Sequence, residues 1–339
     1  MIKNTLSSIN NFVKPSSHIL FVVGTNMLKS SIKLLEFKKH LESLSHHVET
    51  IQKKRSFIDE SEIITFSNKN EIPNLIVCVG GGSVIDYAKA LIFYNFKRKR
   101  KEFKFFAIPT TCGSGSESTE FAVIYNKGIK KSLVSKELKP DYVILEPKFL
   151  NEIPKQVLWS SISDSFSQSL ESLWSKNASS QSISYSTKAL TFLKSGISDV
   201  NKLDKEKLLL ASYYSGCAIN LTKTTAPHAF SYFLTIKFSV PHGFAVLFTL
   251  KEFIKINLAS EESKVNFFKK LGGIYFQLND LYLVIDKILK ESGYKYLLDI
   301  SSFNDCEKYI NEDRLNNNPV KISKRNFNSI YINSLKYHT

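Results

Sequence analysis

In the first half of the chain, short apolar runs of strand length alternate with longer stretches in which apolar residues recur at helical spacing. The runs rich in β-branched and aromatic residues occupy positions 18–23, 75–79, 103–108, 121–125 and 142–145. Helical spacing occupies positions 28–44 and 84–96. Strands that alternate with helices predict a Rossmann-like α/β domain, with a parallel sheet covered on both faces.

After Pro154 the pattern changes, and strand signals become rare. Apolar residues at helical spacing predict helices at positions 159–174, 181–197, 205–220 and 244–256. A chain of 339 residues is long for one core, so two domains are expected. The sequence therefore predicts an α/β domain over residues 1–153 and an all-α domain over residues 154–339.

The composition is that of a globular protein, since 43% of the residues are hydrophobic and 12% are aromatic. The longest apolar runs, at 19–23 and 75–79, have the length of strands and are too short to cross a membrane. The start of the chain lacks the basic-then-apolar order of a signal peptide. We therefore expect a cytoplasmic protein that does not bind a membrane.

The formal net charge of +15 raises the question of nucleic-acid binding. The lysines are scattered, however, and the one dense basic run, at 97–101, follows a predicted helix, where a solvated loop explains it equally well. We therefore expect no nucleic-acid partner, although a positive field can steer an anionic metabolite to a binding site. The four cysteines form no CxxC pair, which indicates reduced thiols.

Two loops have the composition of ligand-binding loops. Gly80, Gly81, Gly82 and Ser83 follow a predicted strand and open a predicted helix, where the backbone can approach a phosphate closely and the helix N-terminus offers free N–H groups. A tight turn without a ligand is the alternative. The second loop, positions 108–117, also follows a strand end and is dominated by small and hydroxyl residues. Two such loops at neighbouring strand ends match the cofactor position of an open α/β sheet.

Four residues of the helical half form a candidate metal site. Asp164 and Gln168 are four positions apart, so both side chains project from one face of a predicted helix. His228 begins another helical segment, and His242 follows in Val-Pro-His-Gly. One carboxylate, two imidazoles and an amide oxygen are suitable ligands for Zn²⁺ or Fe²⁺. The alternative is that these are ordinary, partly buried polar residues.

Taken together, these motifs resemble the iron-containing alcohol dehydrogenase family, which shares its fold with dehydroquinate synthase. The matching segments occur in the family's order between about residues 75 and 320. They are positions 80–89, 108–111 and 115–117, Pro140-Asp141, Glu146-Pro147, Asp164, Glu171, positions 228–243 and Asn318-Pro319.

The resemblance implies a role for each matching residue. It implies that the first domain binds a dinucleotide, NADH or NADPH, through Gly81, Gly82, Ser83, Asp86, Thr110, Thr111, Ser114 and Lys130. It also implies that Asp164, His228 and His242 ligate Fe²⁺ or Zn²⁺ in the second domain, with Gln168 as a fourth candidate. Family members are dimers or larger homo-oligomers, so we expect an oligomer here as well.

Two positions depart from the usual family pattern. Most members have His at the position of Gln168 and a second His at the position of Tyr232. With the surrounding segments 168–175 and 222–232, this combination resembles the phosphonoacetaldehyde reductase branch. That resemblance implies the reduction of phosphonoacetaldehyde to 2-hydroxyethylphosphonate in phosphonate biosynthesis.

Under that hypothesis, the residues that differ from the usual family pattern, and a nearby lysine, have specific roles. Gln168 completes the metal site through its amide oxygen or leaves one position to water. Tyr232, one helical turn after His228, donates a hydrogen bond to the substrate or only packs. Lys223 is the first candidate for the phosphonate, and a plain surface lysine is its alternative. The turn Gly24-Thr25-Asn26 has no carboxylate to repel a 2′-phosphate, so NADPH is possible beside NADH.

Three other functions remain open at this point. A general alcohol or aldehyde dehydrogenase of the same family acts on plain short-chain substrates. A dehydroquinate-synthase-like cyclase is a lyase that uses NAD only transiently. A non-catalytic binding protein on a former enzyme scaffold is disfavoured, because Asp164, His228 and His242 are all present.

Overall fold

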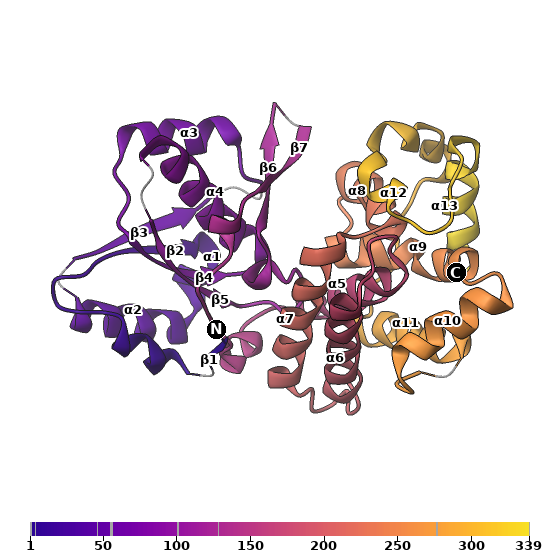
Figure 1. Cartoon of the computed structure of the whole chain (residues 1–339), viewed down its shortest axis with the longest axis horizontal. Helices are drawn as coiled ribbons and strands as arrows, with labels where there is room; N and C mark the ends of the chain where they lie inside the picture. The colour runs from indigo at the N-terminus through magenta and orange to yellow at the C-terminus, as the bar shows by residue number, and fades with distance from the viewer. Residues whose placement is uncertain are drawn as a thin grey trace. The chain divides into compact units, whose positions relative to one another are not determined.

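A computed structural model describes residues 2–3, 5–45, 47–54, 57–99, 102–127, 129–275 and 277–338. Contacts within the chain divide it into two units, Met1–Ile153 and Pro154–Thr339. The first unit contains a parallel sheet with helices and the second is almost entirely helical (Figure 1), which confirms the predicted fold class.

The sheet of the first unit has six strands, all paired in parallel. In spatial order they are β1 (Ile2–Lys3), β8 (Tyr142–Ile144), β5 (Lys104–Pro109), β4 (Leu75–Gly80), β2 (His18–Gly24) and β3 (His47–Lys53). Four of these strands were predicted. The prediction missed β1 and β3, and β3 lies at the sheet edge, where a largely polar sequence is stable.

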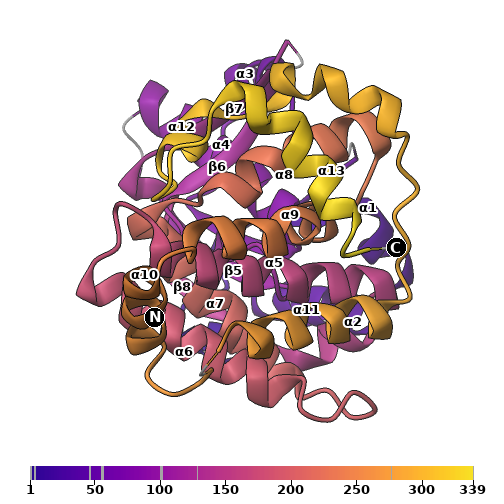
Figure 2. The same ribbon diagram turned by 90° about the vertical axis from the view of Figure 1, so that its right-hand side faces the viewer.

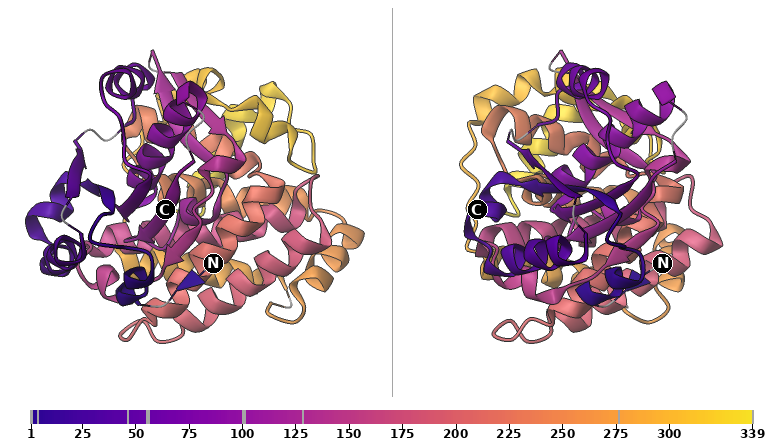
Figure 3. Two further views of the ribbon diagram at one scale, coloured as in Figure 1. Left: turned by 60° about the vertical axis from the view of Figure 1, so that its left-hand side comes forward. Right: turned by 90° about the vertical axis from the view of Figure 1, so that its left-hand side faces the viewer.

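Alternate side chains of the strands build two separate cores. One face packs against α3 (Glu60–Lys69) and α4 (Gly82–Lys99) through Leu20, Val22, Ile76 and Cys78. The other face packs against α2 (Ile32–Leu44) and the 3₁₀ helix η1 (Leu6–Asn11) through Ile19, Phe21, Val77 and Val79. In Figures 1 and 3, α3 and α2 lie on opposite sides of the sheet. Both faces are therefore buried, as the apolar runs predict.

The predicted strand at 121–125 exists, but it is not part of the parallel sheet. It is β6 (Phe121–Asn126), which pairs antiparallel with β7 (Ile129–Val134) in a separate two-stranded sheet (Figure 1). Apolar alternation predicts a strand but does not identify its partner.

Two predicted helices differ in their bounds. The stretch 28–44 covers the end of α1 (Thr25–Ser30) and all of α2, because the Ser31 hydroxyl accepts a hydrogen bond from Leu34 N and caps a new helix. The basic run at 97–101 was expected to be a loop, but α4 continues through Lys99. Arg100 and Lys101 lie outside the described residues. Lysine and arginine favour helices, so the extension is consistent with their propensity.

In the second unit, α5 (Lys155–Trp174) packs against α6, α7, α9 and α11 (Figures 1 and 2). The other helices of this unit are α6 (Ser180–Gly196), α7 (Lys205–Thr222), α8 (Ala226–Phe238), α9 (His242–Asn257), α10 (Glu261–Leu271), α11 (Leu278–Ser292), α12 (Glu312–Asn316) and α13 (Phe327–Leu335). Shorter 3₁₀ segments in the chain are η2 (Ser116–Ser118), η3 (Lys136–Leu138), η4 (Pro147–Asn151), η5 (Ile300–Tyr309) and η6 (Lys324–Asn326).

Helix α5 is buried although it is rich in serine. Its buried hydroxyls bond back to carbonyl groups of the same helix, as Ser167 does to Ser163 O at 2.8 Å and Ser169 to Ser165 O at 2.7 Å. These bonds satisfy both hydroxyls within the helix, whereas the Ser172 hydroxyl accepts from Thr222 Oγ1 of α7 at 3.1 Å. Small side chains also allow α7 and α9 to approach α5 closely. In the described part of the chain, no helix combines the length and apolarity that a membrane span requires.

Candidate metal centre and nucleotide-binding loops

Asp164, His228 and His242 converge in the helical unit, and one ligand atom from each lies within 4.8 Å of the others. The Oδ1 atom of Asp164 is 3.2 Å from Nε2 of His228 and 3.9 Å from Nε2 of His242. The three residues come from α5, the first turn of α8 and the first position of α9. Two imidazoles and one carboxylate form a donor set that fits Fe²⁺ or Zn²⁺ and leaves coordination positions open.

The close approach of α9 to α5 depends on Gly243. A Cβ atom at this position would lie 1.7 Å from the carbonyl oxygen of Ser160, so no larger residue fits without moving a helix. Gly243 follows His242 directly. The contact therefore places the His242 imidazole beside Asp164, one turn further along α5.

Glu171 orients the imidazole of His228. The carboxylate is fully buried, and its Oε1 atom is 2.5 Å from His228 Nδ1. Its Oε2 atom accepts hydrogen bonds from the backbone N–H and the hydroxyl of Thr225, at 2.5 and 3.0 Å. Trp174 Nε1 donates to the same hydroxyl at 2.9 Å. Because Nδ1 is engaged by a carboxylate, Nε2 is left facing Asp164, which is the arrangement that a metal-ligating histidine requires.

The charges at this site favour a bound cation. Burial lowers the pKa of His228, but the carboxylates of Glu171 and Asp164 outweigh burial and raise the pKa to about 9. Burial also raises the pKa of Asp164, yet the neighbouring His242 and His228 lower it overall. Two buried carboxylates thus attract positive charge to one place. A divalent cation can satisfy the same field in place of the proton on His228.

Gln168 lies beside this group, but its amide oxygen faces away from Asp164. The Nε2 group donates to Asp164 Oδ1 at 3.1 Å, and Oε1 accepts from the hydroxyl of Ser215 at 3.0 Å. Ligation through the amide oxygen would require the amide to turn over. The Ser215 hydroxyl permits this, since it can accept as well as donate. Direct ligation by Gln168 therefore stays a prediction.

The two residues expected to contact the substrate lie near the start of α8. Tyr232 is one turn after His228 and is 8% exposed, and the guanidinium carbon of Arg314 lies 5.8 Å from its ring centre. Lys223 ends α7 with an exposed side chain and a positive φ of 62°. The roles of Tyr232 and Lys223 in catalysis stay predictions.

In the first unit, the two candidate cofactor loops pack directly against each other. The parallel register places Gly80 beside Pro109, and Thr110 N donates to Gly80 O at 3.1 Å. A Cβ atom on Gly82 would lie 2.3 Å from Ser114 Oγ. Gly82 also begins α4, so N–H groups at the start of this helix belong to the same loop. This is the edge of the sheet at which nucleotides bind in open α/β folds.

The other predicted cofactor residues surround these loops. Gly81 packs on Thr111, since a Cβ atom on Gly81 would lie 3.3 Å from that side chain. Ser83 is exposed in the first turn of α4. Their contact with a cofactor stays a prediction.

Asp86 contacts the second loop through one carboxylate oxygen and strand β6 through the other. It accepts hydrogen bonds from Ser116 Oγ at 2.5 Å and from Val123 N at 2.9 Å. Burial raises the pKa of Asp86, and the charges of Lys89 and, more weakly, Lys130 oppose that rise. These bonds indicate that Asp86 shapes the loop, whereas direct cofactor binding by Asp86 and Lys130 stays a prediction.

Comparison with known proteins places both units in one family. Residues 2–147 match the profile described as iron-containing alcohol dehydrogenase, and residues 160–280 match the C-terminal region of the same family. The chain is also 31% identical over 255 residues to 4-hydroxybutyrate dehydrogenase of Clostridium kluyveri and covers 68% of it. The chain belongs to the iron-containing alcohol dehydrogenase family. The predicted family is thereby confirmed.

Further relatives carry varied names. The chain is 29% identical over 212 residues to phosphonoacetaldehyde reductase of Streptomyces viridochromogenes. It is 32% identical over 192 residues to 1-propanol dehydrogenase of Salmonella typhimurium. These matches cover 55% of this chain in each case, and 54% and 52% of the two relatives, about half of their length. They agree on the family but differ in the substrate.

A solved structure supports the fold over the whole chain. Sulfoacetaldehyde reductase from Bifidobacterium kashiwanohense, in complex with NAD⁺, superposes with a TM-score of 0.83 at 24% identity. The match covers 98% of this chain and 95% of that protein. The two proteins therefore share one fold along almost their whole length.

The roles of several residues around the metal site were not predicted from the sequence. Glu171 was matched to the family without a role, and Thr225, Trp174 and Arg314 were not singled out. Their contacts join segments that are 51 or more positions apart, so no local pattern reveals them. The only available signal was that Glu171 shares one face of α5 with Asp164 and Gln168.

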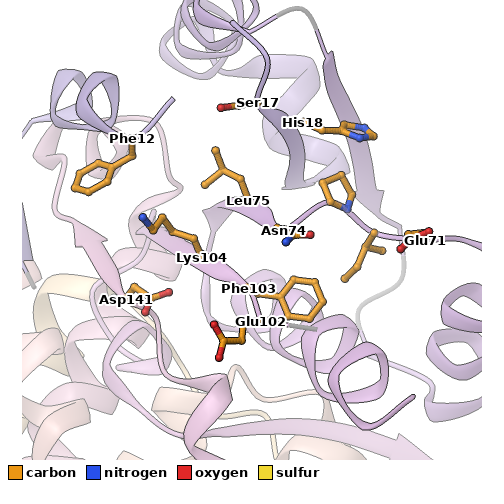
Figure 4. Close-up of a pocket in the computed structure, with 12 residues that line it drawn as sticks. Phe12, Ser17, His18, Glu71, Asn74, Leu75, Glu102, Phe103, Lys104 and Asp141 are labelled. Atoms are coloured by element: carbon orange, nitrogen blue, oxygen red, sulfur yellow. The ribbon is translucent and has the colours of Figure 1, made fainter. Parts of the chain in front are cut away.

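A hollow at the other end of the sheet is separate from the cofactor loops of this dehydrogenase fold. It has a volume of about 950 Å³ and is lined by residues at the amino ends of β2, β4 and β5, including His18, Leu75 and Lys104 (Figure 4). The glycine turn lies at the carboxyl end of β4. Ligands of open α/β sheets bind at the carboxyl ends, so this hollow is not the nucleotide site.

Proposed function

We propose that this protein uses a divalent metal and a nicotinamide cofactor to reduce a small aldehyde, and that phosphonoacetaldehyde is its substrate. The observation that carries the proposal is the convergence of Asp164, His228 and His242 within 4.8 Å. Membership of the iron-containing alcohol dehydrogenase family supports the reaction type.

The metal residues prepare the site for carbonyl chemistry. Asp164, His228 and His242 would hold Fe²⁺ or Zn²⁺, which would supply Lewis acidity toward the aldehyde carbonyl. Asp164 and His242 supply two donors, while Glu171 holds His228 with Nε2 turned toward them. Tyr232, one turn after His228, would position the substrate or donate a hydrogen bond to it.

The glycine turn would bind the pyrophosphate of the cofactor. Gly81 and Gly82 have no side chains, so a ligand can approach the backbone at the start of α4 closely. The free N–H groups of this helix end favour a negatively charged ligand. We place Thr110, Thr111 and Ser114 along the cofactor. The absence of a carboxylate in Gly24-Thr25-Asn26 supports use of NADPH as well as NADH.

The substrate proposal rests on Gln168, Tyr232 and the names of relatives. Phosphonoacetaldehyde reductase, sulfoacetaldehyde reductase and 4-hydroxybutyrate dehydrogenase are each named for a short substrate that carries an acidic group. The formal charge of +15 would favour the approach of such an anion. Phosphonoacetaldehyde fits this chemistry.

A coupled assay tests the proposal directly. Purified protein is loaded with Fe²⁺ or Zn²⁺, and oxidation of NADH or NADPH is followed with phosphonoacetaldehyde. We expect metal-dependent oxidation that a chelator abolishes. Full activity in the presence of a chelator would contradict the proposed role of the metal. If no aldehyde causes oxidation of NADH or NADPH, the proposed reductase activity is wrong.

The second candidate is a general short-chain alcohol dehydrogenase. It is favoured by the similarity to 1-propanol dehydrogenase. The same assay with propanal separates the two: similar kcat/KM values for propanal and phosphonoacetaldehyde would support the general enzyme.

A further inference from the structure

Arg314 is held against the segment that carries the metal ligands. It lies in α12 and is half-buried, and its guanidinium donates a hydrogen bond to the Thr224 hydroxyl. The same guanidinium lies over the Tyr232 ring, at 5.8 Å from the ring centre. Its position is thus defined by two contacts, one polar and one aromatic.

A buried amide network fixes α12 in this place. Asn317, just after α12, donates to Thr222 O at 2.7 Å and to Thr224 O at 3.0 Å. Its own amide oxygen accepts from Ser175 Oγ at 2.9 Å and Asn177 Nδ2 at 3.0 Å. The backbone around Arg314 is therefore tied to the ends of α5 and α7, and the guanidinium does not depend on a flexible surface loop.

Among the residues that the structure describes, Arg314 has no acidic partner. Within the described residues it forms no ion pair with a carboxylate, although Glu312 and Asp313 precede it in the sequence. Arginine is also rare here, since Arg314 and Arg325 are the two arginines after Pro154. A half-buried guanidinium that is not neutralised by the protein is available to an anion, and its planar fork suits an oxyanion better than lysine does.

The Tyr232 ring links the guanidinium to the helix that carries His228. Tyr232 is four positions after His228, so both side chains project from one face of this helix, about 6 Å apart along its axis. Arg314 also donates a hydrogen bond to the Thr224 hydroxyl. The next residue, Thr225, is hydrogen-bonded to the Glu171 carboxylate that orients His228. Two short chains of contacts thus connect Arg314 to His228, one through Tyr232 and the other through Thr224, Thr225 and Glu171.

We propose that Arg314 is a specificity-determining residue that binds the acidic group of the substrate while the aldehyde carbonyl is directed to Asp164, His228 and His242. This rests on the proposed function and refines it: the preferred aldehyde carries a phosphonate or another oxyanion a few bonds from its carbonyl. Tyr232 supports the guanidinium through its ring. Exposed Lys223, next to Thr224, adds positive charge at the entrance to this anion site.

Binding of the product measures the proposal without catalysis. The metal-loaded protein is titrated with 2-hydroxyethylphosphonate, and binding is followed by calorimetry for the native chain, Arg314→Gln and Arg325→Gln. Arg325 is the matched control, because it is an exposed arginine in η6, a different segment of the chain. We expect Arg314→Gln to weaken binding about 10- to 100-fold, as for loss of a charge-assisted pair, and Arg325→Gln to leave it unchanged.

Steady-state kinetics give a second readout. Arg314→Gln should raise KM for phosphonoacetaldehyde at least about tenfold but leave kcat/KM for propanal within about twofold. Arg314→Lys should recover only part of the loss, because an ammonium group cannot form the paired contacts of a guanidinium.

Three outcomes separate the hypotheses. Equal product binding by Arg314→Gln and the native chain would overturn the role of Arg314, and so would a native chain that binds no phosphonate. If the native chain binds the phosphonate through Arg314 but reduces no aldehyde, the anion site stands and the proposed reductase function fails. Ethanesulfonate and propionate, titrated in parallel, identify which oxyanion the site prefers.

Discussion

The buried carboxylate of Glu171 lies 2.5 Å from Nδ1 of His228, on the side of the ring opposite Asp164. The pair joins α5 to α8, and the same carboxylate binds the N–H and hydroxyl of Thr225. His228 is therefore fixed in orientation before any metal binds.

Replacement of Glu171 by Gln should weaken metal binding about 10- to 100-fold, because the neutral amide stabilises the ligand histidine less. The side chain keeps its shape, so the fold should remain intact. Metal affinity is measured by competition with a chelator and by tryptophan fluorescence, since both tryptophans, Trp159 and Trp174, lie in α5. Glu252→Gln, which removes a buried carboxylate bonded to Asn333 and Tyr337, is the control. Unchanged metal affinity in Glu171→Gln would refute the orienting role.

Replacement of Gly243 by Ala should damage the metal site by displacing a helix. The added methyl group would lie 1.7 Å from Ser160 O, so α9 must move and carry His242 away from Asp164. We expect weaker metal binding together with a loss of about 1–3 kcal/mol in the free energy of unfolding. Gly272→Ala is a useful contrast, because its φ of 59° makes the variant strained while nothing lies within 4 Å of the new methyl group. It should lose stability but retain metal affinity.

The amide orientation of Gln168 predicts unequal effects of two alanine substitutions. Asp164→Ala removes a carboxylate from the centre of the group and should reduce metal affinity at least about 100-fold. Gln168→Ala should reduce it less than about tenfold, because the amide oxygen faces Ser215. Chelator competition on both variants decides the matter. A Gln168→Ala protein as weak as Asp164→Ala would show that the amide turns over and ligates the metal.

Stability at mildly acidic pH should depend on His338. Burial lowers the pKa of His338 to about 4, and the ring is stacked on Phe248 at 4.8 Å with Nε2 at 2.8 Å from Phe248 O. The unfolded chain binds the proton near its ordinary pKa of about 6.5, so the stabilising effect is present above that pH and is lost as the pH falls toward 4.

Urea unfolding of the native chain and His338→Gln between about pH 7 and pH 5 measures this contribution. The native chain should lose more stability than the variant over this range. Parallel curves would show that His338 does not contribute. The comparison isolates one group, since every other titrating residue is common to both proteins.

Elements with one dominant apolar periodicity are predicted well from the sequence. Strands at the edge of a sheet, and the pairing partners of strands, are predicted less well. The strands at 18–23 and 75–79 are continuous apolar runs because both sheet faces are buried. Strand β3 was missed because an edge strand with half-exposed residues needs no such run. Strand β6 was found, but its partner β7 was not predicted, since pairing depends on residues outside the run.

In the candidate site, too, features with a local motif were predicted, whereas long-range contacts were not. Asp164, His228 and His242 were identified through motif order, and they do converge in the structure. Arg314 was not identified, because it lies in a five-residue helix and contacts Thr224, 90 positions earlier. Glu171 shares a helix face with Asp164, but its partner His228 is 57 positions away. Long-range polar contacts of this kind have no signature in local spacing.

Replacement of Gly82 by Ala should separate the two cofactor loops. The new methyl group would lie 2.3 Å from Ser114 Oγ, so either the start of α4 or the second loop must shift. We expect binding of NADH and NADPH, measured by nucleotide fluorescence, to weaken at least about tenfold, because the helix N-terminus no longer meets the pyrophosphate. Gly24→Ala, whose methyl group would be at an ordinary 3.4 Å from Val84, is the control and should bind nucleotide much more tightly than Gly82→Ala. Native affinity in Gly82→Ala would place the cofactor elsewhere, whereas equal losses in both variants would show that the whole sheet edge, and not the glycine turn alone, determines binding.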